Sequence, residues 1–151
     1  MSGASPKIEV GDLSNKRVAI VSAQWHPEIC DALVAGAQRA LREAGIEEVE
    51  IRKVAGSFEI PLAAQRLLDA GCDAVVTVGL VLRGETPHFD YVCQGVTSGV
   101  MDVMLSRSKP IGFGVLMCDD LDQARARSGL PGSKEDKGYD AAKAALDLLN
   151  P

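Results

Sequence analysis

The histidines and the single tryptophan of this chain fall at turns that follow apolar runs. Residues 24–26, Gln-Trp-His, come after RVAIVSA, and residues 83–88, Arg-Gly-Glu-Thr-Pro-His, come after DAVVTVGLVL. A third turn, residues 56–59 (Gly-Ser-Phe-Glu), follows EVEIRKVA. A histidine moves protons near neutral pH, a tryptophan offers a ring for stacking, and a carboxylate binds polar groups. These residue types predict a site that binds a polar ring and transfers a proton.

The turn before His88 has a structural and a functional interpretation. Thr86 and Pro87 are the residue types of a helix N-cap and a first-turn proline, which accounts for both structurally. A helix start preceded by a glycine is also an anion site, because its free amides and the positive end of its dipole face the ligand. His88, at the second helical position, suits proton transfer better than core packing.

Other polar residues admit the same two kinds of interpretation. Glu59, in the first turn of a predicted helix, either complements the helix dipole or binds a polar substrate. Trp25 is either a core residue or a stacking face. Four basic residues near the last two helices are either solvated charges or partners of a phosphate: Arg125, Arg127, Lys134 and Lys137.

The elements that must position these turns alternate along the chain. Strands are predicted at residues 17–23, 48–55, 73–82 and 110–117, and helices at residues 27–44, 57–71, 87–108, 121–129 and 137–149. This order indicates right-handed crossovers and a parallel sheet with helices on both faces. We predict an α/β fold, a single flavodoxin-like three-layer αβα domain over residues 15–151. Its strands' carboxyl ends share one edge, where ligands bind in such sheets.

Three local details go with this assignment. Residues 1–14 are predicted to form a flexible N-terminal arm, with a short strand at residues 8–10. Ser57 is predicted to be the N-cap of the second helix. Gly95 and Gly99 lie inside the long third helix, where each costs roughly 1 kcal/mol relative to alanine, so we expect close packing against another backbone there.

Composition excludes several classes of protein. The net charge of −5 argues against nucleic-acid and anionic-membrane partners, which need a basic face. No apolar run approaches the roughly 20 residues of a membrane span, and the first residues lack the pattern of a secretory signal, so a cytoplasmic protein is expected. The four cysteines show no paired spacing, which predicts reduced, buried thiols and no zinc site.

The better-known ligand motifs of this architecture are missing from the sequence. The loop SAQWHP contains no glycine, so a dinucleotide-binding G-x-G-x-x-G fails, and G-x-x-x-x-G-K-[ST] is absent. A flavodoxin-type loop of hydroxyls and glycine is also missing. A response-regulator receiver would need acidic residues where Trp25 and Arg83 stand, so that binding module is disfavoured.

The segment GLVLRGETPHFDYV, residues 79–92, closely resembles the signature of the lumazine synthase family. VAGSFEIP, residues 54–61, resembles that family's V-x-G-(S/A)-x-E-x-P segment, and PIGFGVL, DQARARSG and EDKG fit its last strand and closing helices. The resemblance extends from about residue 18 to 149. It implies condensation of 5-amino-6-ribitylamino-uracil with 3,4-dihydroxy-2-butanone 4-phosphate to 6,7-dimethyl-8-ribityllumazine, the penultimate step of riboflavin biosynthesis, by a transferase without cofactor or metal.

The resemblance also implies roles for single residues. Trp25 stands where the family stacks an aromatic on the pyrimidine, and backbone groups of Val81 and Leu82 meet the pyrimidine edge. Ser57 and Glu59 hold the ribityl chain, and Phe58 between them is counted as substrate-binding.

Glu85 and Thr86 fall in the implied phosphate loop, and His88 at the position of proton transfer. Three residues match positions that reach a neighbouring subunit's site, among which Arg127 is the phosphate partner: Phe113, Arg127 and Lys137.

The resemblance further implies a cyclic pentamer with active sites between subunits. Some family members stack twelve pentamers into a shell, but the loop GLPGSKEDKG looks longer than in those relatives, which favours a free pentamer. The sequence departs from the family at residues 117–119, where Met-Cys-Asp replaces paired threonines, and at Glu85, whose carboxylate must point away from a phosphate. Two alternatives remain: a non-catalytic homologue that binds a flavin or lumazine, and a structural shell protein.

Overall fold

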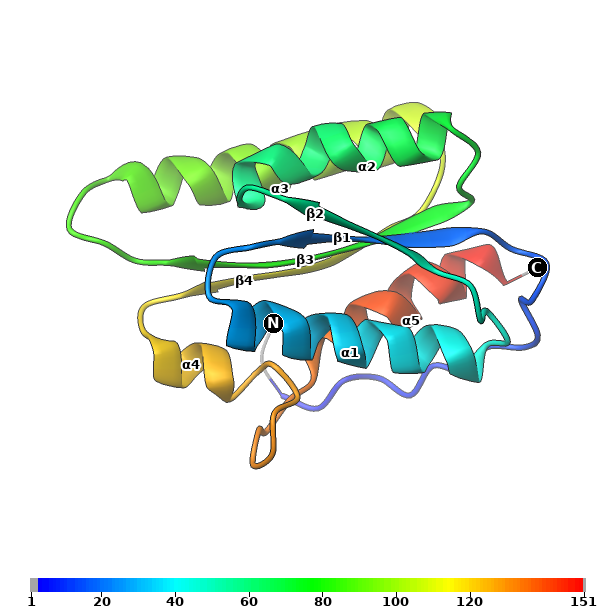
Figure 1. The fold of residues 1–151 in the computed structure, drawn as a ribbon, viewed down its shortest axis with the longest axis horizontal. Coiled ribbons are helices and arrows are strands. Elements are labelled where there is room, and N and C mark those ends of the chain that lie inside the picture. Colours follow the sequence, from blue (N-terminus) through cyan, green and yellow to red (C-terminus); the bar gives the residue numbers. More distant parts are fainter. Residues whose placement is uncertain (1–2, 151) are drawn as a thin grey trace.

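A four-stranded parallel sheet lies between two layers of helices (Figure 1). The structure, a computed structural model, describes residues 3–150; the first two residues of the predicted arm and the last residue of the predicted domain lie outside it. The strands are β1 (Val18–Ala23), β2 (Glu50–Val54), β3 (Ala74–Leu82) and β4 (Ile111–Cys118), in the spatial order β2-β1-β3-β4. Every neighbouring pair is parallel, so the predicted flavodoxin-like three-layer fold is confirmed.

The central strands are the most apolar runs of the chain. All six residues of β1 are buried, as expected of a strand covered on both faces, whereas β2 is an exposed edge strand. Strand β3 pairs with β1 only as far as Ser22 and Val78, but it continues to Leu82 beside β4. The carboxyl edge of the sheet is therefore stepped, with the ends of β3 and β4 standing beyond the ends of β1 and β2.

Helices α2 (Ile60–Asp69) and α3 (His88–Arg107) cover one face of the sheet, and α1 (Pro27–Glu43), α4 (Leu121–Arg125) and α5 (Lys137–Leu149) cover the other (Figure 1). Alternate buried residues of β1, β3 and β4 enter the two cores, because successive side chains of a strand point to opposite faces. In β1, Ile20 packs with α1 and α5, whereas Val21 packs with α2 and α3.

The second predicted helix begins differently from the prediction. Residues Ser57–Glu59 form a single 3₁₀ turn, η1, and α2 starts only at Ile60. Ser57 is therefore not the N-cap; its side chain is buried and its Oγ has no hydrogen-bond partner.

The other helix boundaries shift by smaller amounts, except in α4. Helix α3 starts at His88 rather than Pro87, and α4 ends at Arg125 instead of continuing to residue 129. After α4 the chain reaches an isolated antiparallel bridge between Ser128 and Asp136, and Gly129, with φ +76°, begins the turn between these two residues.

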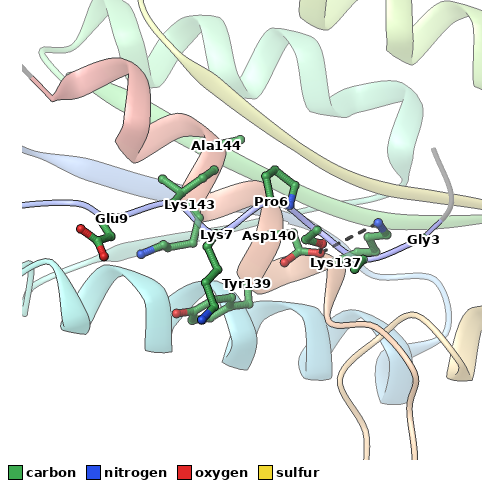
Figure 2. Close-up of a pocket in the computed structure, with 12 residues that line it drawn as sticks. Gly3, Pro6, Lys7, Glu9, Lys137, Tyr139, Asp140, Lys143 and Ala144 are labelled. Atoms are coloured by element: carbon green, nitrogen blue, oxygen red, sulfur yellow. Dashed lines mark hydrogen bonds and ion pairs between the residues drawn. The ribbon is translucent and has the colours of Figure 1, made fainter.

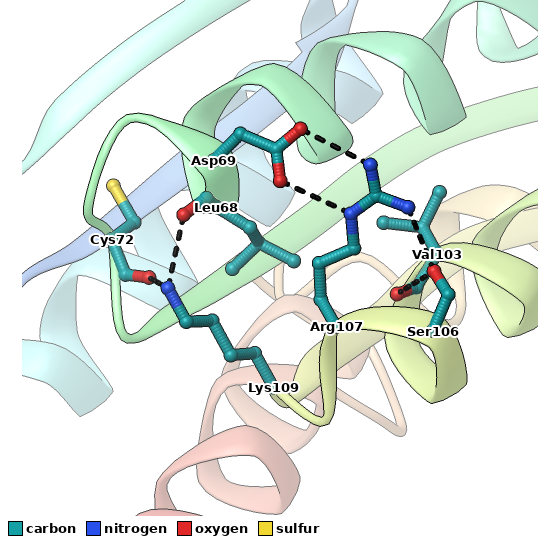
Figure 3. Close-up of polar contacts among 7 residues, drawn as sticks. All are labelled: Leu68, Asp69, Cys72, Val103, Ser106, Arg107 and Lys109. Atoms are coloured by element: carbon teal, nitrogen blue, oxygen red, sulfur yellow. Dashed lines mark hydrogen bonds and ion pairs between the residues drawn. The ribbon is translucent and has the colours of Figure 1, made fainter.

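Polar contacts join the carboxyl-terminal ends of α2 and α3 (Figure 3). The guanidinium of Arg107 donates two hydrogen bonds to the carboxylate of Asp69, at 3.0 and 3.1 Å. Lys109 Nζ donates to the carbonyl oxygens of Leu68, in the last turn of α2, and Cys72, just beyond that helix, each at 3.0 Å. These contacts fix how α2 and α3 lie together.

The glycines of α3 permit a close approach, though not to another backbone. A Cβ at Gly95 would come within 2.7 Å of the Phe58 ring, and one at Gly99 within 2.7 Å of Pro61. The expected contact is thus made with side chains, and it brings η1 and α2 against the first half of α3.

The described part of the N-terminal arm contacts residues near the ends of α1 and α5. The strand expected at residues 8–10 does not form. Instead, Asn150 Nδ2 donates to the carbonyl oxygen of Glu9 at 3.2 Å, and the Leu13 amide donates to the carbonyl of Ala44 at 2.9 Å. Flexibility of the arm stays a prediction. Among the described residues, no helix is long and apolar enough to cross a membrane.

Helix α5 packs on α1 through Gly138, and this contact admits no larger residue. A Cβ there would overlap the carbonyl group of Leu33, which belongs to rigid helix backbone. We predict that Gly138→Ala lowers the free energy of unfolding by at least about 2 kcal/mol, measured by urea denaturation at one protein concentration. Gly11→Ala is the control, since its Cβ would meet only Asn150 Oδ1 at 4.0 Å. Equal stability of the two variants would contradict this packing.

Candidate functional site

A cleft of about 690 Å³ opens at the stepped carboxyl edge of the sheet. The turns after β1 and β2 line it at the foot of the step, and the end of β3 with the start of α3 lines it above. Eight of the twelve predicted site residues line this cleft: Trp25, Ser57, Phe58, Glu59, Val81, Leu82, Thr86 and His88. The convergence of the three turns is thereby confirmed.

Trp25 presents its ring at the rim of the cleft. Its side chain is 66% exposed, which excludes the core interpretation. The next residue, His26, has the left-handed φ of 55°, which turns the chain sharply into α1. The indole lies against Gly56, where a Cβ would come within 3.1 Å of its Nε1. The backbone below is fixed by Cys30, whose Sγ donates to the Trp25 carbonyl at 3.1 Å.

The η1 turn places the Ser57 hydroxyl against β3, next to Gly79. Ser57 Oγ is buried without a hydrogen-bond partner, which is costly unless a ligand or water supplies one. Gly79 provides the space, since a Cβ at that point of β3 would lie 2.8 Å from Ser57 Oγ. Phe58 packs on Gly95 of α3, and the exposed Glu59 carboxylate follows on the same turn. The turn thus combines a buried, unpaired hydroxyl with an exposed carboxylate.

The loop between β3 and α3 combines open backbone with a tethered arginine. Gly84 has no atom within 4 Å of where its Cβ would be, and Thr86 Oγ1 accepts a hydrogen bond from the His88 amide at 3.4 Å. Arg83 points elsewhere: its Nε donates to Asp119 at 2.8 Å, and its guanidinium carbon lies 4.4 Å from the centroid of the Phe89 ring. The Arg83 hydrogen bond lowers the pKa of the Asp119 carboxyl below its ordinary value.

The His88 amide donates to Thr86 Oγ1 and the Asp90 amide donates to the Pro87 carbonyl, so the helix dipole and the remaining free amides are what attract an anion to the start of α3. Helix α3 has 20 residues, and its first amides and dipole face the loop at residues 84–87. His88, on the first turn, lines the cleft and is exposed. The loop can therefore hold a phosphate next to a proton carrier.

The cysteines do not supply a nucleophile to the cleft. Burial raises the pKa of the Cys30 thiol to about 11, and burial is also the main cause that raises the pKa of Cys72, Cys93 and Cys118. All four are free, and three of them are buried, as the sequence predicted. Within residues 3–150, no three His, Cys, Asp or Glu residues are grouped to hold a metal ion.

Four predicted site residues do not line the cleft: Glu85, Phe113, Arg127 and Lys137. Glu85 is exposed on the loop between β3 and α3, and Phe113 is 40% exposed on β4, an edge strand of the sheet. Arg127 and Lys137 lie beyond α4, on either side of the bridge between residues 128 and 136. Of the described residues around the cleft, none is a lysine or an arginine.

A second pocket, of about 620 Å³, lies between the arm and α5 (Figure 2). Lys137 lines it with Tyr139, Asp140 and Lys143, and the Lys137 ammonium lies 3.9 Å from the Asp140 carboxylate. This pocket shares no residue with the cleft at the sheet edge. Lys137 thus faces away from the cleft of its own chain.

Several residues that line the cleft have no role predicted from the sequence. Gly56 and Gly84 lie in turns that the sequence singles out. Lacking side chains, they leave room for the Trp25 ring and keep the loop backbone open. Val92 could have been found from helical spacing, since the residue four positions after His88 shares its face, whereas the position of Phe89 could not. His26 stands in a turn that the sequence singles out but has no predicted role, and Ala55 and Leu80, which carry no chemical signal, complete the lining.

Comparisons with known proteins agree over nearly the whole chain. A family model described as 6,7-dimethyl-8-ribityllumazine synthase matches residues 15–151. A protein of that name from Kineococcus radiotolerans is 55% identical over 99% of this chain and 92% of its own length. Similar proteins of the same name come from Paenarthrobacter aurescens, 54% identical over 97% of this chain and 94% of its own, and Streptomyces coelicolor, 50% identical over 97% and 91%.

The contact between Trp25 and Gly56 can be tested by fluorescence, since Trp25 is the only tryptophan. We predict that Gly56→Ala moves the indole outward, because the new methyl would approach it within 3.1 Å, and that quenching by acrylamide increases. Fold stability should change by no more than about 1 kcal/mol, because an exposed ring can move. Gly84→Ala is the control in the same cleft. Identical quenching in both variants would contradict the assigned contact.

Proposed function

Because the chain belongs to the 6,7-dimethyl-8-ribityllumazine synthase family, we propose that its reaction takes place in the cleft at the carboxyl edge of the sheet. The protein is a transferase of riboflavin biosynthesis. It condenses 5-amino-6-ribitylamino-uracil with 3,4-dihydroxy-2-butanone 4-phosphate to give 6,7-dimethyl-8-ribityllumazine. The observation that carries the proposal is the convergence, in one cleft, of the Trp25 ring, the η1 turn and the start of α3.

The aminopyrimidine occupies the part of the cleft that is lined by the turns after β1 and β2. Its ring stacks on Trp25, and its edge forms hydrogen bonds with backbone groups of Val81 and Leu82, where β3 has passed the end of β1 and its edge is open. The ribityl chain runs over η1 toward Glu59. Support comes from Ser57 Oγ, a buried hydroxyl that has no protein partner and gains one from a polyol.

The butanone phosphate occupies the upper part of the cleft. Its phosphate binds the amides at the start of α3 and the Thr86 hydroxyl, while the Glu85 side chain, which does not line the cleft, stays outside. A Schiff base forms between the two substrates, phosphate leaves, and the ring closes with loss of water. His88 transfers protons beside the leaving phosphate. Most of the acceleration comes from holding two reactive molecules together.

A second chain completes this site. A phosphate dianion is poorly balanced by a helix start and a hydroxyl alone, and no described residue around the cleft supplies a cation. Arg127, Lys137 and Phe113 of a neighbouring subunit fill this role. Exposed apolar side chains on α2 and α3 offer contact surface for the assembly: Leu62, Tyr91, Met101 and Leu105.

The proposed assembly is a free homo-pentamer in the cytoplasm. The long loop of residues 129–138 projects beyond α4 and favours the free pentamer over a shell, and the four free thiols suit a reducing compartment.

Activity tests these roles directly. Purified protein mixed with the two substrates should form the lumazine, followed by absorbance and fluorescence, faster than the uncatalysed background. We predict that Arg127→Ala lowers kcat/KM by about 100-fold or more, because a charge-assisted phosphate contact is lost, whereas His88→Ala lowers kcat by about tenfold. Arg42→Ala, which removes an exposed cation in the last turn of α1 that lines neither pocket, is the control. A wild-type protein that binds flavin or lumazine tightly but does not accelerate the reaction would place it in the non-catalytic alternative.

Mixing two inactive variants tests whether sites lie between chains. Trp25→Ala and Arg127→Ala damage different walls of the proposed composite site. When the two variants are denatured together and refolded, we predict recovery of activity, up to about a quarter of the wild-type value, because some sites then combine two intact walls. Sedimentation velocity should show pentamers in every sample. No recovery in mixed pentamers, or a megadalton particle, would contradict the proposed assembly.

A further inference from the structure

One carboxylate lies between the two cations that the proposed function assigns to phosphate binding. Glu135 Oε2 is 3.7 Å from Arg127 Nε, and Glu135 Oε1 is 3.8 Å from Lys137 Nζ. The Glu135 side chain is only 19% exposed, less than either cation, so it is not a solvated surface charge. A negative group beside a phosphate site needs an explanation, because it opposes phosphate binding.

The backbone holds Glu135 firmly in this place. The amides of Lys134 and Glu135 both donate to the carbonyl of Ala126, at 2.9 and 3.0 Å, and the Lys137 amide donates to the carbonyl of Arg127 at 2.9 Å. The neighbouring Asp136 is fixed by the guanidinium of Arg39 at 2.6 Å. The carboxylate therefore approaches both cations as part of a built segment.

Within one chain, Glu135 offsets the cost of a cation at the start of α5 and leaves hydrogen-bond donors of Arg127 unused. Lys137 is the first residue of α5, where the helix dipole disfavours a cation, and Glu135 and Asp140 offset that cost. Neither Glu135 contact is a hydrogen bond, since both distances exceed 3.5 Å. The only side-chain hydrogen bond of the Arg127 guanidinium in the described structure is from Nη1 to the carbonyl of Gln123 at 2.9 Å. Arg127 therefore keeps donors for a phosphate while Glu135 stays in place.

We propose that Glu135 is a positioning residue that limits the affinity of Arg127 and Lys137 for phosphate, so that inorganic phosphate leaves after each turnover. This inference rests on the proposed phosphate role of Arg127 and Lys137. Bound phosphate dianion lies within several ångströms of the carboxylate, and the repulsion at that distance, screened by water and salt, weakens binding by roughly threefold to tenfold. The butanone phosphate is weakened equally through its phosphate, but it regains affinity from its carbon chain.

The test is inhibition of the assembled enzyme by inorganic phosphate, in competition with the butanone phosphate at constant ionic strength. Glu135→Gln should lower the inhibition constant of phosphate roughly threefold to tenfold and lower KM for the butanone phosphate. Glu135→Asp, which keeps the charge, should stay near the wild type. Asp122→Asn is the matched control: it removes one carboxylate from the same region, but Asp122 pairs with Arg125 and is 95% exposed.

The outcomes separate this inference from the proposed function. A purely structural role for Glu135 predicts weaker phosphate inhibition in Glu135→Gln, because its two cations would be less ordered; that result, or no change, would overturn the inference. If Glu135→Gln does not assemble, Glu135→Ala is judged by the same criterion. Arg127→Ala must abolish the phosphate inhibition of residual activity. Unchanged inhibition in Arg127→Ala would overturn the proposed phosphate site itself, whatever Glu135→Gln does.

Discussion

The overhang of β3 beyond β1 is the constraint on which the rest of this molecule depends. Strand β3 needs β4 as a partner to continue to Leu82, because its other edge is free after Val78. Gly79, at the first unpaired position, leaves room for Ser57 and lets η1 enter beneath the overhang. The cleft is the space under this step. The proposed site for the pyrimidine ring lies at one end, and the proposed phosphate loop lies at the other.

Charge divides the proposed site between two chains. The cleft of one chain provides a ring, a carboxylate, a hydroxyl and a helix start, while its own Arg127 and Lys137 follow α4 in the chain and do not line the cleft. A single chain can therefore bind the neutral pyrimidine better than a phosphate dianion. In the proposed assembly a neighbouring chain supplies the cations, and the role proposed for Glu135 is to weaken their hold on a phosphate that arrives on a substrate and leaves as a product.

The sequence predicts most of the fold and which turns meet at the site, but not the contacts that residues make there. Buried strands such as residues 73–82 are continuous apolar runs, and parallel order alone brings their carboxyl ends together. Ser57 was misassigned because a serine before a helix has the pattern of an N-cap, whereas the actual turn is 3₁₀ and buries the hydroxyl under Gly79. The contacts of Arg83 with Asp119, and of Glu135 with two cations, join residues across loops, and no local pattern encodes them.

The most direct measurement is a crystal structure of the assembled protein with an analogue that joins a ribitylaminopyrimidine to an alkyl phosphonate. The account predicts the ring on Trp25, the ribityl chain over Ser57 and Glu59, and the phosphonate at the start of α3 in contact with Arg127 of a second chain. A phosphonate bound in the pocket beside the arm and α5, or a ring that avoids Trp25, would contradict the account.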